Sequence, residues 1–228
     1  MATVLITGAN RGVGLELTRC FAANGDTVLA CCRKPEAASD LQSVRGSVEI
    51  FPLDVADASK VNALVASLGG RAIDVLVNNA GILGPDYADQ TAFEMDFEGF
   101  AETLNVNTIA PVRMMQSLLP NLRASGSARV INITSQMGAI GLDVTMAFAY
   151  CSSKAALNKF MKLAAIELGK ENIYVGLIHP GWVQTEMGGA DADITPQESA
   201  AGIFSTIGLL NEQTNGSFWK WDGETHAW

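Results

Sequence analysis

Tyr150 and Lys154 stand four residues apart in a stretch whose pattern predicts a long helix. This spacing places both side chains on one face of the helix, within reach of each other or of a shared ligand. An unperturbed tyrosine has a pKa of about 10 and is a poor base at neutral pH, but a neighbouring ammonium group stabilises the phenolate and lowers the pKa. Such a pair is suited to giving a proton to a carbonyl oxygen or taking one from an alcohol. On spacing alone, an exposed tyrosine beside a solvated lysine is the more common arrangement.

Two more polar residues stand at positions suited to the same chemistry. Ser135 ends a predicted strand, at the edge of a parallel sheet where ligands bind, and its hydroxyl is suited to holding a substrate carbonyl. Asn107 interrupts a helical pattern and is suited to holding a water molecule or a helix carbonyl. Local capping or turn formation is the structural alternative for both side chains.

Three glycines follow the first predicted strand, where Gly8, Gly12 and Gly14 form the pattern G-x-x-x-G-x-G. Glycines permit a tight turn and let backbone N–H groups approach a pyrophosphate at the N-terminus of the following helix. An ordinary glycine-rich turn has the same composition, because such spacings recur by chance. The position after the first strand of a parallel sheet favours a dinucleotide site, since ligands bind beyond the carboxyl ends of the strands.

The end of the second predicted strand indicates which dinucleotide binds. An acidic residue there would bind a ribose 2′-hydroxyl and repel a 2′-phosphate. Here Arg33 and Lys34 follow the strand, no acid occurs before Glu36, and Arg11 lies within the glycine turn. The guanidinium group of arginine holds a phosphate with a fork of donors. We therefore expect NADP(H) rather than NAD(H), with a solvated basic loop as the alternative.

These residues need a scaffold that brings distant segments together, and the sequence predicts alternating strands and helices. Strands of five or six apolar residues without alternation indicate a parallel sheet buried on both faces. Repeated strand–helix units give an α/β fold, a doubly wound parallel sheet of Rossmann type with about seven strands and helices on both faces. No linker or repeat divides residues 1–228, so we expect a single domain. The expected strands are Thr3–Thr7, Thr27–Cys32, Val48–Leu53, Ile73–Val77, Arg129–Thr134, Ile173–Ile178 and Ser217–Trp221; the expected helices are Arg11–Asn24, Val61–Leu68, Thr91–Leu104, Thr108–Arg123, Met146–Gly169 and one that begins near Pro196.

Composition argues against several classes of protein and partner. The net charge of −9 argues against nucleic acid or an anionic membrane surface as a partner. No apolar run approaches the ~18 residues of a membrane helix, and the start lacks the features of a secretory signal. The four cysteines form no C-x-x-C pair, which favours reduced thiols and a cytoplasmic protein. We expect no metal site, since His179 and His226 belong to no cluster with metal-ligand spacing.

Seven short blocks give the sequence a family resemblance. They are TGANRGVG at Thr7–Gly14, LDV at Leu53–Val55, NNAG at Asn78–Gly81, NVNT at Asn105–Thr108, ITS at Ile133–Ser135, YCSSK at Tyr150–Lys154 and HPGWVQT at His179–Thr185. In these blocks and their order the chain resembles the short-chain dehydrogenase/reductase family over essentially its whole length. Within the family it is most similar to the C-factor and sniffer-type carbonyl reductases, in CRKP after the second strand, in HPGWVQTEMGG and in the ending WDGETHAW.

The resemblance implies roles for the matching positions. Tyr150 would be the general acid in reduction and the base in oxidation, with Lys154 lowering its pKa and holding the nicotinamide ribose. Ser135 would bind the substrate oxygen, and Asn107 would complete a proton relay through water to Lys154. The implied cofactor residues are Gly8, Asn10, Arg11, Gly12, Val13 and Gly14 at the pyrophosphate and adenosine end, Arg33 at the 2′-phosphate, Asp54 and Val55 at the adenine, Asn79, Ala80 and Gly81 at the adenosine ribose, and Pro180, Gly181, Val183 and Thr185 at the nicotinamide carboxamide, together with Tyr150 and Lys154.

We expect the substrate region mainly at residues 182–200 and in the C-terminal tail. The segment between Thr185 and Pro196 is short for the family, which favours an open, permissive pocket. The substrate residues would be Ser135, Met137, Phe148, Tyr150, Trp182 and Met187. On a strand, Trp219 and Trp221 face the same side; they either seal the core or form a hydrophobic wall for the substrate or a dimer contact.

The expected function is that of an NADPH-dependent carbonyl reductase or alcohol dehydrogenase acting on a small ketone, aldehyde or alcohol. The same residues would also serve a reductase of a C=C or imine bond. A signalling or regulatory protein that uses the fold to bind NAD(P) or a partner is a third possibility, since a fold does not establish turnover. The family resemblance also implies a homodimer or homotetramer paired through the long helices. The physiological substrate and the stereochemistry lie beyond the sequence.

Overall fold

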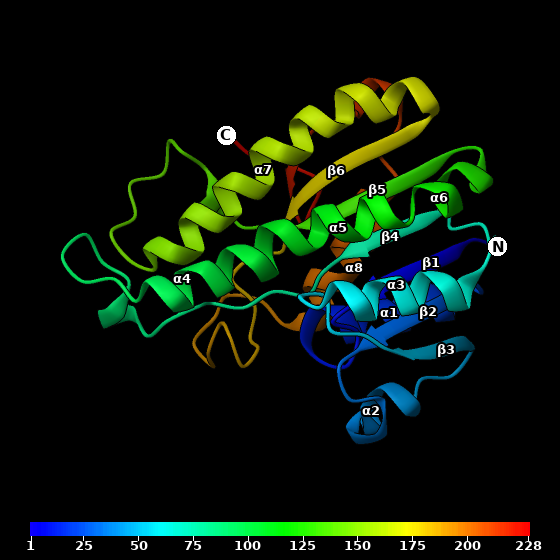
Figure 1. Cartoon of the computed structure of the whole chain (residues 1–228), viewed down its shortest axis with the longest axis horizontal. Helices are drawn as coiled ribbons and strands as arrows, with labels where there is room; N and C mark the ends of the chain where they lie inside the picture. The colour runs from blue at the N-terminus through cyan, green and yellow to red at the C-terminus, as the bar shows by residue number, and fades with distance from the viewer.

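One sheet of seven parallel strands forms the centre of the protein (Figure 1). In the computed structural model, which describes all residues 1–228, the strand order is β3-β2-β1-β4-β5-β6-β7. The strands are β1 (Thr3–Thr7), β2 (Thr27–Cys32), β3 (Ser47–Pro52), β4 (Val75–Asn78), β5 (Ala128–Ile133), β6 (Ile173–His179) and β7 (Phe218–Lys220). The chain winds outward from β1 in one direction and then from β4 in the other, so the predicted doubly wound α/β fold is confirmed.

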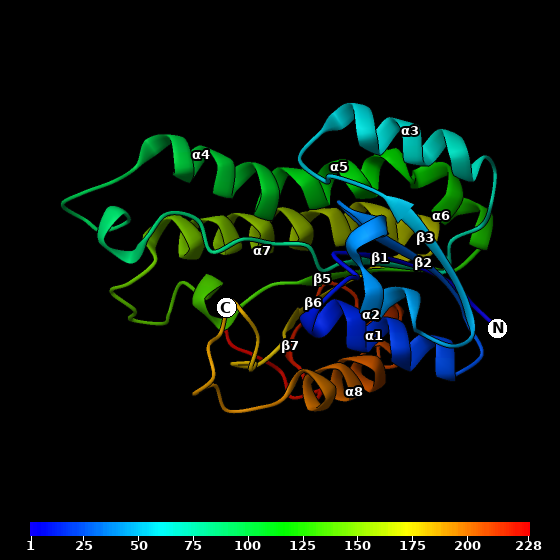
Figure 2. The same ribbon diagram turned by 90° about the horizontal axis from the view of Figure 1, so that it is seen from below.

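Helices cover both faces of the sheet (Figure 2). The helices are α1 (Gly12–Ala23), α2 (Ser39–Gln42), α3 (Ala58–Leu68), α4 (Phe97–Leu104), α5 (Ala110–Ser117), α6 (Leu119–Ser125), α7 (Phe148–Leu168) and α8 (Pro196–Ile207). One core packs the sheet against α3, α5 and α7, and a second core packs it against α1 and α8. The side chains of β1 alternate between the two faces of the sheet: Leu5 packs in the first core, and Val4 and Ile6 pack in the second. None of the helices has the length and apolar character needed to cross a membrane.

The edge strand β3 differs from the expected pattern of uninterrupted burial. Its residues alternate between exposed and partly buried, with Ser47 and Glu49 exposed to solvent. The reason is that β3 is the edge strand and has a neighbour, β2, on one side only. Burial on both faces therefore holds for the central strands, where β1 and β4 carry runs of buried residues.

Two expected helices are shorter than the sequence pattern predicted. The helix expected from Thr91 begins at Phe97, because Asp96 caps it by accepting hydrogen bonds from the amides of Glu98 and Gly99. The helix expected over Thr108–Arg123 is interrupted at Leu118, whose φ of −94° and ψ of 3° leave the helical region. Pro120 in the first turn of α6 suits a new start there.

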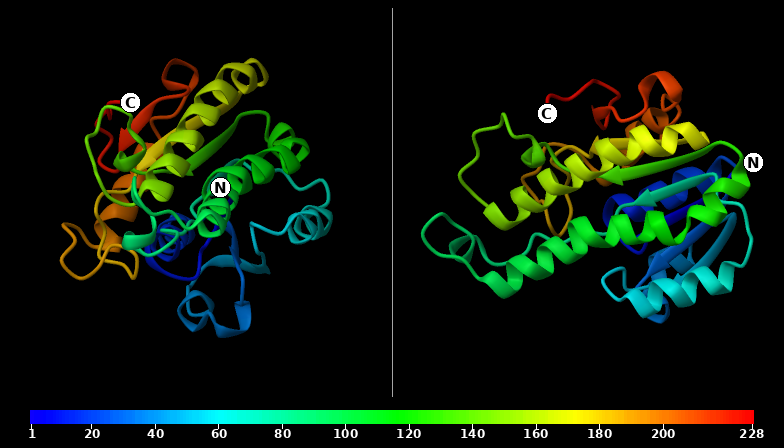
Figure 3. Two further views of the ribbon diagram at one scale, coloured as in Figure 1. Left: turned by 60° about the vertical axis from the view of Figure 1, so that its left-hand side comes forward. Right: turned by 45° about the horizontal axis from the view of Figure 1, so that its top comes forward.

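The C-terminal tail lies along the β7 edge of the sheet (Figure 3). Backbone hydrogen bonds join Lys220 N to Glu224 O at 2.8 Å and His226 N to Phe218 O at 2.7 Å. Trp219 and Trp221 both belong to the core between the sheet and α8, so they face the same side as predicted. Trp228 packs against Phe218, with ring centroids 5.5 Å apart.

Candidate active site

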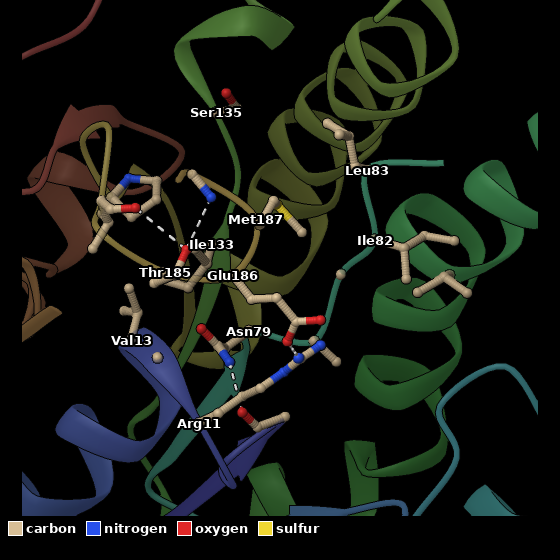
Figure 4. A pocket seen from close by; sticks show the side chains of 18 of the residues that line it. Arg11, Val13, Asn79, Ile82, Leu83, Ile133, Ser135, Thr185, Glu186 and Met187 are labelled. Atoms are coloured by element: carbon tan, nitrogen blue, oxygen red, sulfur yellow. Dashed lines mark hydrogen bonds and ion pairs between the residues drawn. The ribbon is translucent and has the colours of Figure 1, made fainter. Parts of the chain in front are cut away.

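A cleft of about 1490 Å³ opens at the carboxyl ends of the central strands. Its walls come from the segments that follow each of the strands β1 to β6, together with residues of α4, α7 and the segment after α4. Figure 4 shows Arg11, Asn79, Ser135 and Thr185 from these segments around one space. The cleft lies where β1 and β4 are neighbours, which is the point at which the winding of the sheet reverses and ligands bind in such folds.

Most residues that the sequence singled out line this cleft. The predicted cofactor residues in the lining are Gly8, Asn10, Arg11, Gly12, Val13, Arg33, Asp54, Val55, Asn79, Ala80, Gly81, Tyr150, Lys154, Pro180, Gly181, Val183 and Thr185. Gly14 and Asn107 are buried behind the lining. Phe148 lies at the start of α7 and does not line the cleft.

Tyr150 and Ser135 both line the cleft, and the Ser135 hydroxyl lies near enough to influence the phenol. Burial raises the pKa of Tyr150 to about 12, and Ser135 offsets part of this rise. Ser135 reaches this position because it lies two residues beyond the end of β5, where its Oγ accepts a hydrogen bond from Met137 N at 3.1 Å. The expected lowering of the Tyr150 pKa is therefore wrong for this structure, since loss of water around the phenol dominates.

Lys154 lies one turn further along α7 and is also buried. Its Nζ donates a hydrogen bond to Ile133 O at 3.0 Å and lies 5.7 Å from the ring centroid of Tyr150. Burial lowers the pKa of this lysine to about 8, so the ammonium form still predominates at neutral pH. The α7 spacing thus brings the two side chains together as the sequence predicted.

Asn107 lies in a segment of π-helix, Asn105–Ile109, which joins α4 to α5. Such wide turns within a helix occur often at functional sites. Its amide nitrogen donates to Ile82 O at 2.8 Å and to Ser153 Oγ at 3.0 Å, while its amide oxygen accepts from Ile82 N at 2.9 Å. A Cβ on Gly81 would lie 3.2 Å from Asn107 Oδ1 and 3.6 Å from Lys154 Nζ, so the two polar groups flank this glycine.

The glycine turn forms a cradle whose geometry excludes larger residues. Gly8 and Gly12 have φ angles of +65° and +53°, in the left-handed region that favours glycine. A Cβ on Gly14 would overlap the carbonyl oxygen of Gly8, so backbone and helix approach closely at this point. Asn79 holds the turn from the neighbouring strand by donating hydrogen bonds to Thr7 O at 2.9 Å and Gly8 O at 3.2 Å. The open backbone at the N-terminus of α1 fits the pyrophosphate of a dinucleotide.

Cationic side chains lie at the end of the cleft beyond β2. Arg33 and Lys34 line it, and neither forms an ion pair or a side-chain hydrogen bond with the protein. Arg11, in contrast, pairs with Glu186 from the loop after β6 (Figure 4). The sequence did not single out Glu186, because a link between segments so far apart leaves no local pattern.

The cleft wall formed by the loop after β3 is held by a residue that the sequence analysis missed. Asp54 accepts a hydrogen bond from Ala56 N at 3.0 Å, which shapes the loop after β3. The guanidinium of Arg113, on α5, donates to Val55 O at 3.1 Å and Ala56 O at 3.3 Å. Arg113 thus positions the loop that carries Asp54 and Val55.

The opposite end of the cleft is mostly apolar. Met137, Trp182 and Met187 line it as expected, and 48% of the Trp182 surface and 45% of the Met187 surface are exposed. The other side chains at this end are Ile82, Leu83, Tyr87, Glu102, Val106 and Met146. None of the tail residues 201–228 belongs to the lining, so the structure places the tail tryptophans in the core and at the sheet edge rather than in a substrate wall.

The short segment after Trp182 forms a closed loop at the mouth of the cleft. Gln184 N donates to Ile194 O at 2.9 Å, and Ile194 N donates to Trp182 O at 3.1 Å. The indole of Trp182 donates to Gly188 O at 2.8 Å. These bonds tie the loop back to its own base and leave the mouth open on the side of Met187.

Comparison with known proteins places this fold and cleft in a family. The family model for short chain dehydrogenase matches residues 2–194. The NADPH-bound carbonyl reductase from chicken fatty liver is 34% identical, with a TM-score of 0.92 over 100% of this chain and 99% of that chain. The carbonyl reductase Sniffer of D. melanogaster is 32% identical, with a TM-score of 0.92 over 100% of both chains.

One similar protein carries the name of a signal and not that of an enzyme. The C-signal of Myxococcus xanthus is 37% identical over 157 residues, which are 68% of this chain and 93% of that protein. The family match, the likeness to whole carbonyl reductases and the cleft at the reversal of the sheet agree with one another. The chain therefore belongs to the short chain dehydrogenase family and is an oxidoreductase.

Proposed function

We propose that the protein is an NADPH-dependent carbonyl reductase that reduces small ketones or aldehydes and works reversibly on the corresponding alcohols. The observation that carries the proposal is that Ser135, Tyr150 and Lys154 line the same cleft as the glycine cradle, with Ser135 near the phenol of Tyr150. Full-length similarity to carbonyl reductases, one of them bound to NADPH, supports it.

Different residues of the cleft would bind the cofactor, orient the substrate and transfer the proton. NADPH, when bound, supplies the hydride, and the glycine turn, Asn79–Gly81 and Pro180–Thr185 would hold it. The Ser135 hydroxyl donates a hydrogen bond to the substrate carbonyl oxygen and orients it. The Tyr150 hydroxyl gives its proton to that oxygen as the alcohol forms. The ammonium of Lys154 would stabilise the phenolate left behind and hold the cofactor ribose. Asn107 would complete a proton relay through water to Lys154.

The raised pKa of Tyr150 favours reduction over oxidation near neutral pH. With a pKa of about 12 the phenol stays protonated and ready to give a proton. Oxidation of an alcohol needs the phenolate, which becomes more abundant as the pH rises. We therefore expect the rate of carbonyl reduction to hold near neutral pH and the rate of alcohol oxidation to rise as the pH is raised.

The apolar end of the cleft supports small, largely uncharged substrates. Met137, Met146 and Met187 have flexible, polarisable side chains that adapt to different shapes. The open mouth beside the Trp182 loop admits substrates of several sizes. The preference for NADP(H) is supported by Arg33 and Lys34, which have no protein partner at the end of the cleft where a 2′-phosphate would lie.

The test follows NADPH absorbance at 340 nm with a panel of ketones and aldehydes. Tyr150→Phe should lower turnover about 10²- to 10⁴-fold, because the proton donor is lost, while NADPH binding is retained. Tyr174→Phe is the matched control, since Tyr174 lies on β6 outside the cleft and should leave turnover unchanged. Normal ketone turnover by Tyr150→Phe would rule out the proposed acid. A panel that includes activated C=C and imine compounds separates carbonyl reduction from reduction of those bonds.

A second candidate function is supported by the similarity to C-signal. In that case the protein would use its fold to bind NAD(P) or a partner in signalling, with little turnover. Binding of NADPH without reduction of any compound in the panel would favour this role.

The proposal extends to the oligomeric state and to the location in the cell. Phe160, Leu163 and Ile166 form an exposed apolar stripe on α7, which supports a homodimer or homotetramer paired through that helix. All four cysteines are free thiols, which supports a reducing compartment and a cytoplasmic location.

A further inference from the structure

The helix that carries Tyr150 and Lys154 begins without a cap of its own. The residue before it, Ala147, makes no side-chain hydrogen bond and has a φ of +51°, a left-handed conformation that residues other than glycine seldom adopt. Ala147 is also fully buried. The first amide groups of a helix have no partner within the helix and must find one elsewhere. At this helix the missing partner comes from a distant loop.

Gln90 binds three successive amides of the first turn of α7. Its backbone carbonyl accepts from Phe148 N at 3.2 Å. Its side-chain oxygen accepts from Ala149 N at 3.1 Å and from Tyr150 N at 3.3 Å. One residue thus holds the backbone of Tyr150 from a position 60 residues earlier in the chain.

The side chain of Gln90 is itself held in place. It is fully buried, and its Nε2 donates a hydrogen bond to Pro85 O at 2.5 Å. A bridge to Met95 closes the loop around it. With both ends of its amide engaged, Gln90 has a defined orientation, and burial excludes the water that could otherwise replace it.

The loop that contains Gln90 also forms part of the cleft wall. Leu83 and Tyr87 line the apolar end of the cleft, on either side of Pro85, to which Gln90 is bonded. Gly84, with a φ of +92°, leaves no room for a side chain against Thr103 of α4. A single loop therefore contacts the substrate end of the cleft and holds the start of the catalytic helix.

We propose that Gln90 is a positioning residue that sets the place of the Tyr150 hydroxyl by capping α7 from this loop. The inference rests on the proposed function, in which Tyr150 donates the proton. Gln90 does not touch the reacting atoms; it acts through the backbone of Tyr150. Catalysis depends on this placement, because a displacement of about 1 Å at a reacting group can cost a factor of about 10² in rate.

The test compares two substitutions of nearly equal size. Gln90→Met keeps the length of the side chain and removes the acceptor, so kcat for ketone reduction should fall about 10- to 100-fold. The dissociation constant for NADPH should stay within about twofold, since the glycine turn is untouched. Gln90→Glu keeps an oxygen for the two amides, and burial favours the protonated carboxyl, whose hydroxyl can donate to Pro85 O as Nε2 does. This variant should restore kcat to within about threefold of the original protein. Hydrogen exchange at the amides of residues 148–150 should speed up in Gln90→Met and not in Gln90→Glu.

A matched control removes the cap of a helix without site residues. Asp57 caps α3 by accepting from Ser59 N at 2.8 Å and Lys60 N at 3.4 Å, and Asp57→Ala should lower stability without changing kcat. If Gln90→Met does not fold, Gln90→Asn provides the same test. Its side chain is one methylene shorter, so the amide oxygen no longer reaches the amides of Ala149 and Tyr150.

The outcomes separate this inference from the proposed function. Unchanged kcat in a folded Gln90→Met protein, with Tyr150→Phe inactive, would overturn the role of Gln90 alone. Full activity in Tyr150→Phe would overturn the proposed function instead. Failure of both Gln90→Met and Gln90→Asn to fold, or a Gln90→Glu protein no better than Gln90→Met, would reduce Gln90 to a structural residue.

Discussion

Burial moves the pKa values of Tyr150 and Lys154 in opposite directions. The pKa of the Tyr150 phenol rises to about 12 and the pKa of the Lys154 ammonium falls to about 8, because burial removes water from the charged form of each group. Both shifts favour the neutral forms, so the pair is set up to hold a proton on the phenol. A tyrosine that keeps its proton until a negative oxygen develops beside it is well suited to be an acid.

We infer that the choice between NADPH and NADH depends on Arg33. It lines the cleft after β2 without a protein partner, and its charge is available for a 2′-phosphate. A hydrogen bond to a charged group is worth about 1.5–3 kcal/mol. Arg33→Gln should therefore lower the ratio of kcat/KM with NADPH to kcat/KM with NADH by about 10- to 100-fold. Arg45→Gln, at an exposed position outside the cleft, is the control, and a ratio that Arg33→Gln leaves unchanged would place the phosphate elsewhere.

The turn between β1 and α1 is the element that depends most on small residues. Gly14 begins the buried side of α1, and a Cβ there would overlap the Gly8 carbonyl oxygen. Overpacking of this kind costs about 1–3 kcal/mol. Gly14→Ala should lower the free energy of unfolding by that amount and weaken NADPH binding, as measured by denaturant titration and fluorescence.

Gly70 gives a matched control for this substitution. No atom lies within 4 Å of a Cβ built on Gly70, and its φ is outside the left-handed region. Gly70→Ala should leave stability and cofactor binding nearly unchanged. Equal effects of the two alanines would show that loss of chain flexibility, and not overlap with Gly8, determines the result.

For the molecule as a whole, His179 makes stability depend on pH. It is buried at the end of β6, its Nδ1 has no hydrogen-bond partner, and its ring lies 5.8 Å from that of His226. Burial, with smaller contributions from His226 and Lys220, lowers its pKa to about 4, and Asp222 opposes the shift. In the unfolded chain the pKa is about 6.5.

The folded protein therefore takes up this proton less readily than the unfolded chain. The stabilisation is complete above pH 6.5 and is lost as the pH falls toward 4. Between pH 7.5 and pH 5 the loss from this group should be about 2 kcal/mol. Denaturant unfolding at several pH values in this range gives the free energy of unfolding of the original protein and of His179→Asn. The loss due to His179 is the difference between the two proteins in how steeply this free energy falls with pH. Parallel curves would mean that other groups account for the acid sensitivity.

The sequence by itself predicted the architecture and most of the site. Thr3–Thr7 and Thr27–Cys32 are strands at the predicted bounds, because short apolar runs between glycine turns are local signals. The glycine turn and the spacing of Tyr150 and Lys154 are local as well, so their side chains could be placed together before the fold was known. Helix starts were less well predicted, since the cap of α4 by Asp96 and the break at Leu118 depend on single residues.

Only the tertiary structure decided the features that depend on contacts between distant segments. The pKa of Tyr150 rises because the surrounding elements exclude water, which spacing along one helix cannot reveal. The bonds from Gln90 to the start of α7 and from Arg113 to the loop of Asp54 join residues about 60 positions apart. Trp219 lies in the core, and Trp221 packs against it, because β7 joins the sheet beside β6. Local patterns determine which elements form, but burial and long-range hydrogen bonds exist only once those elements have packed.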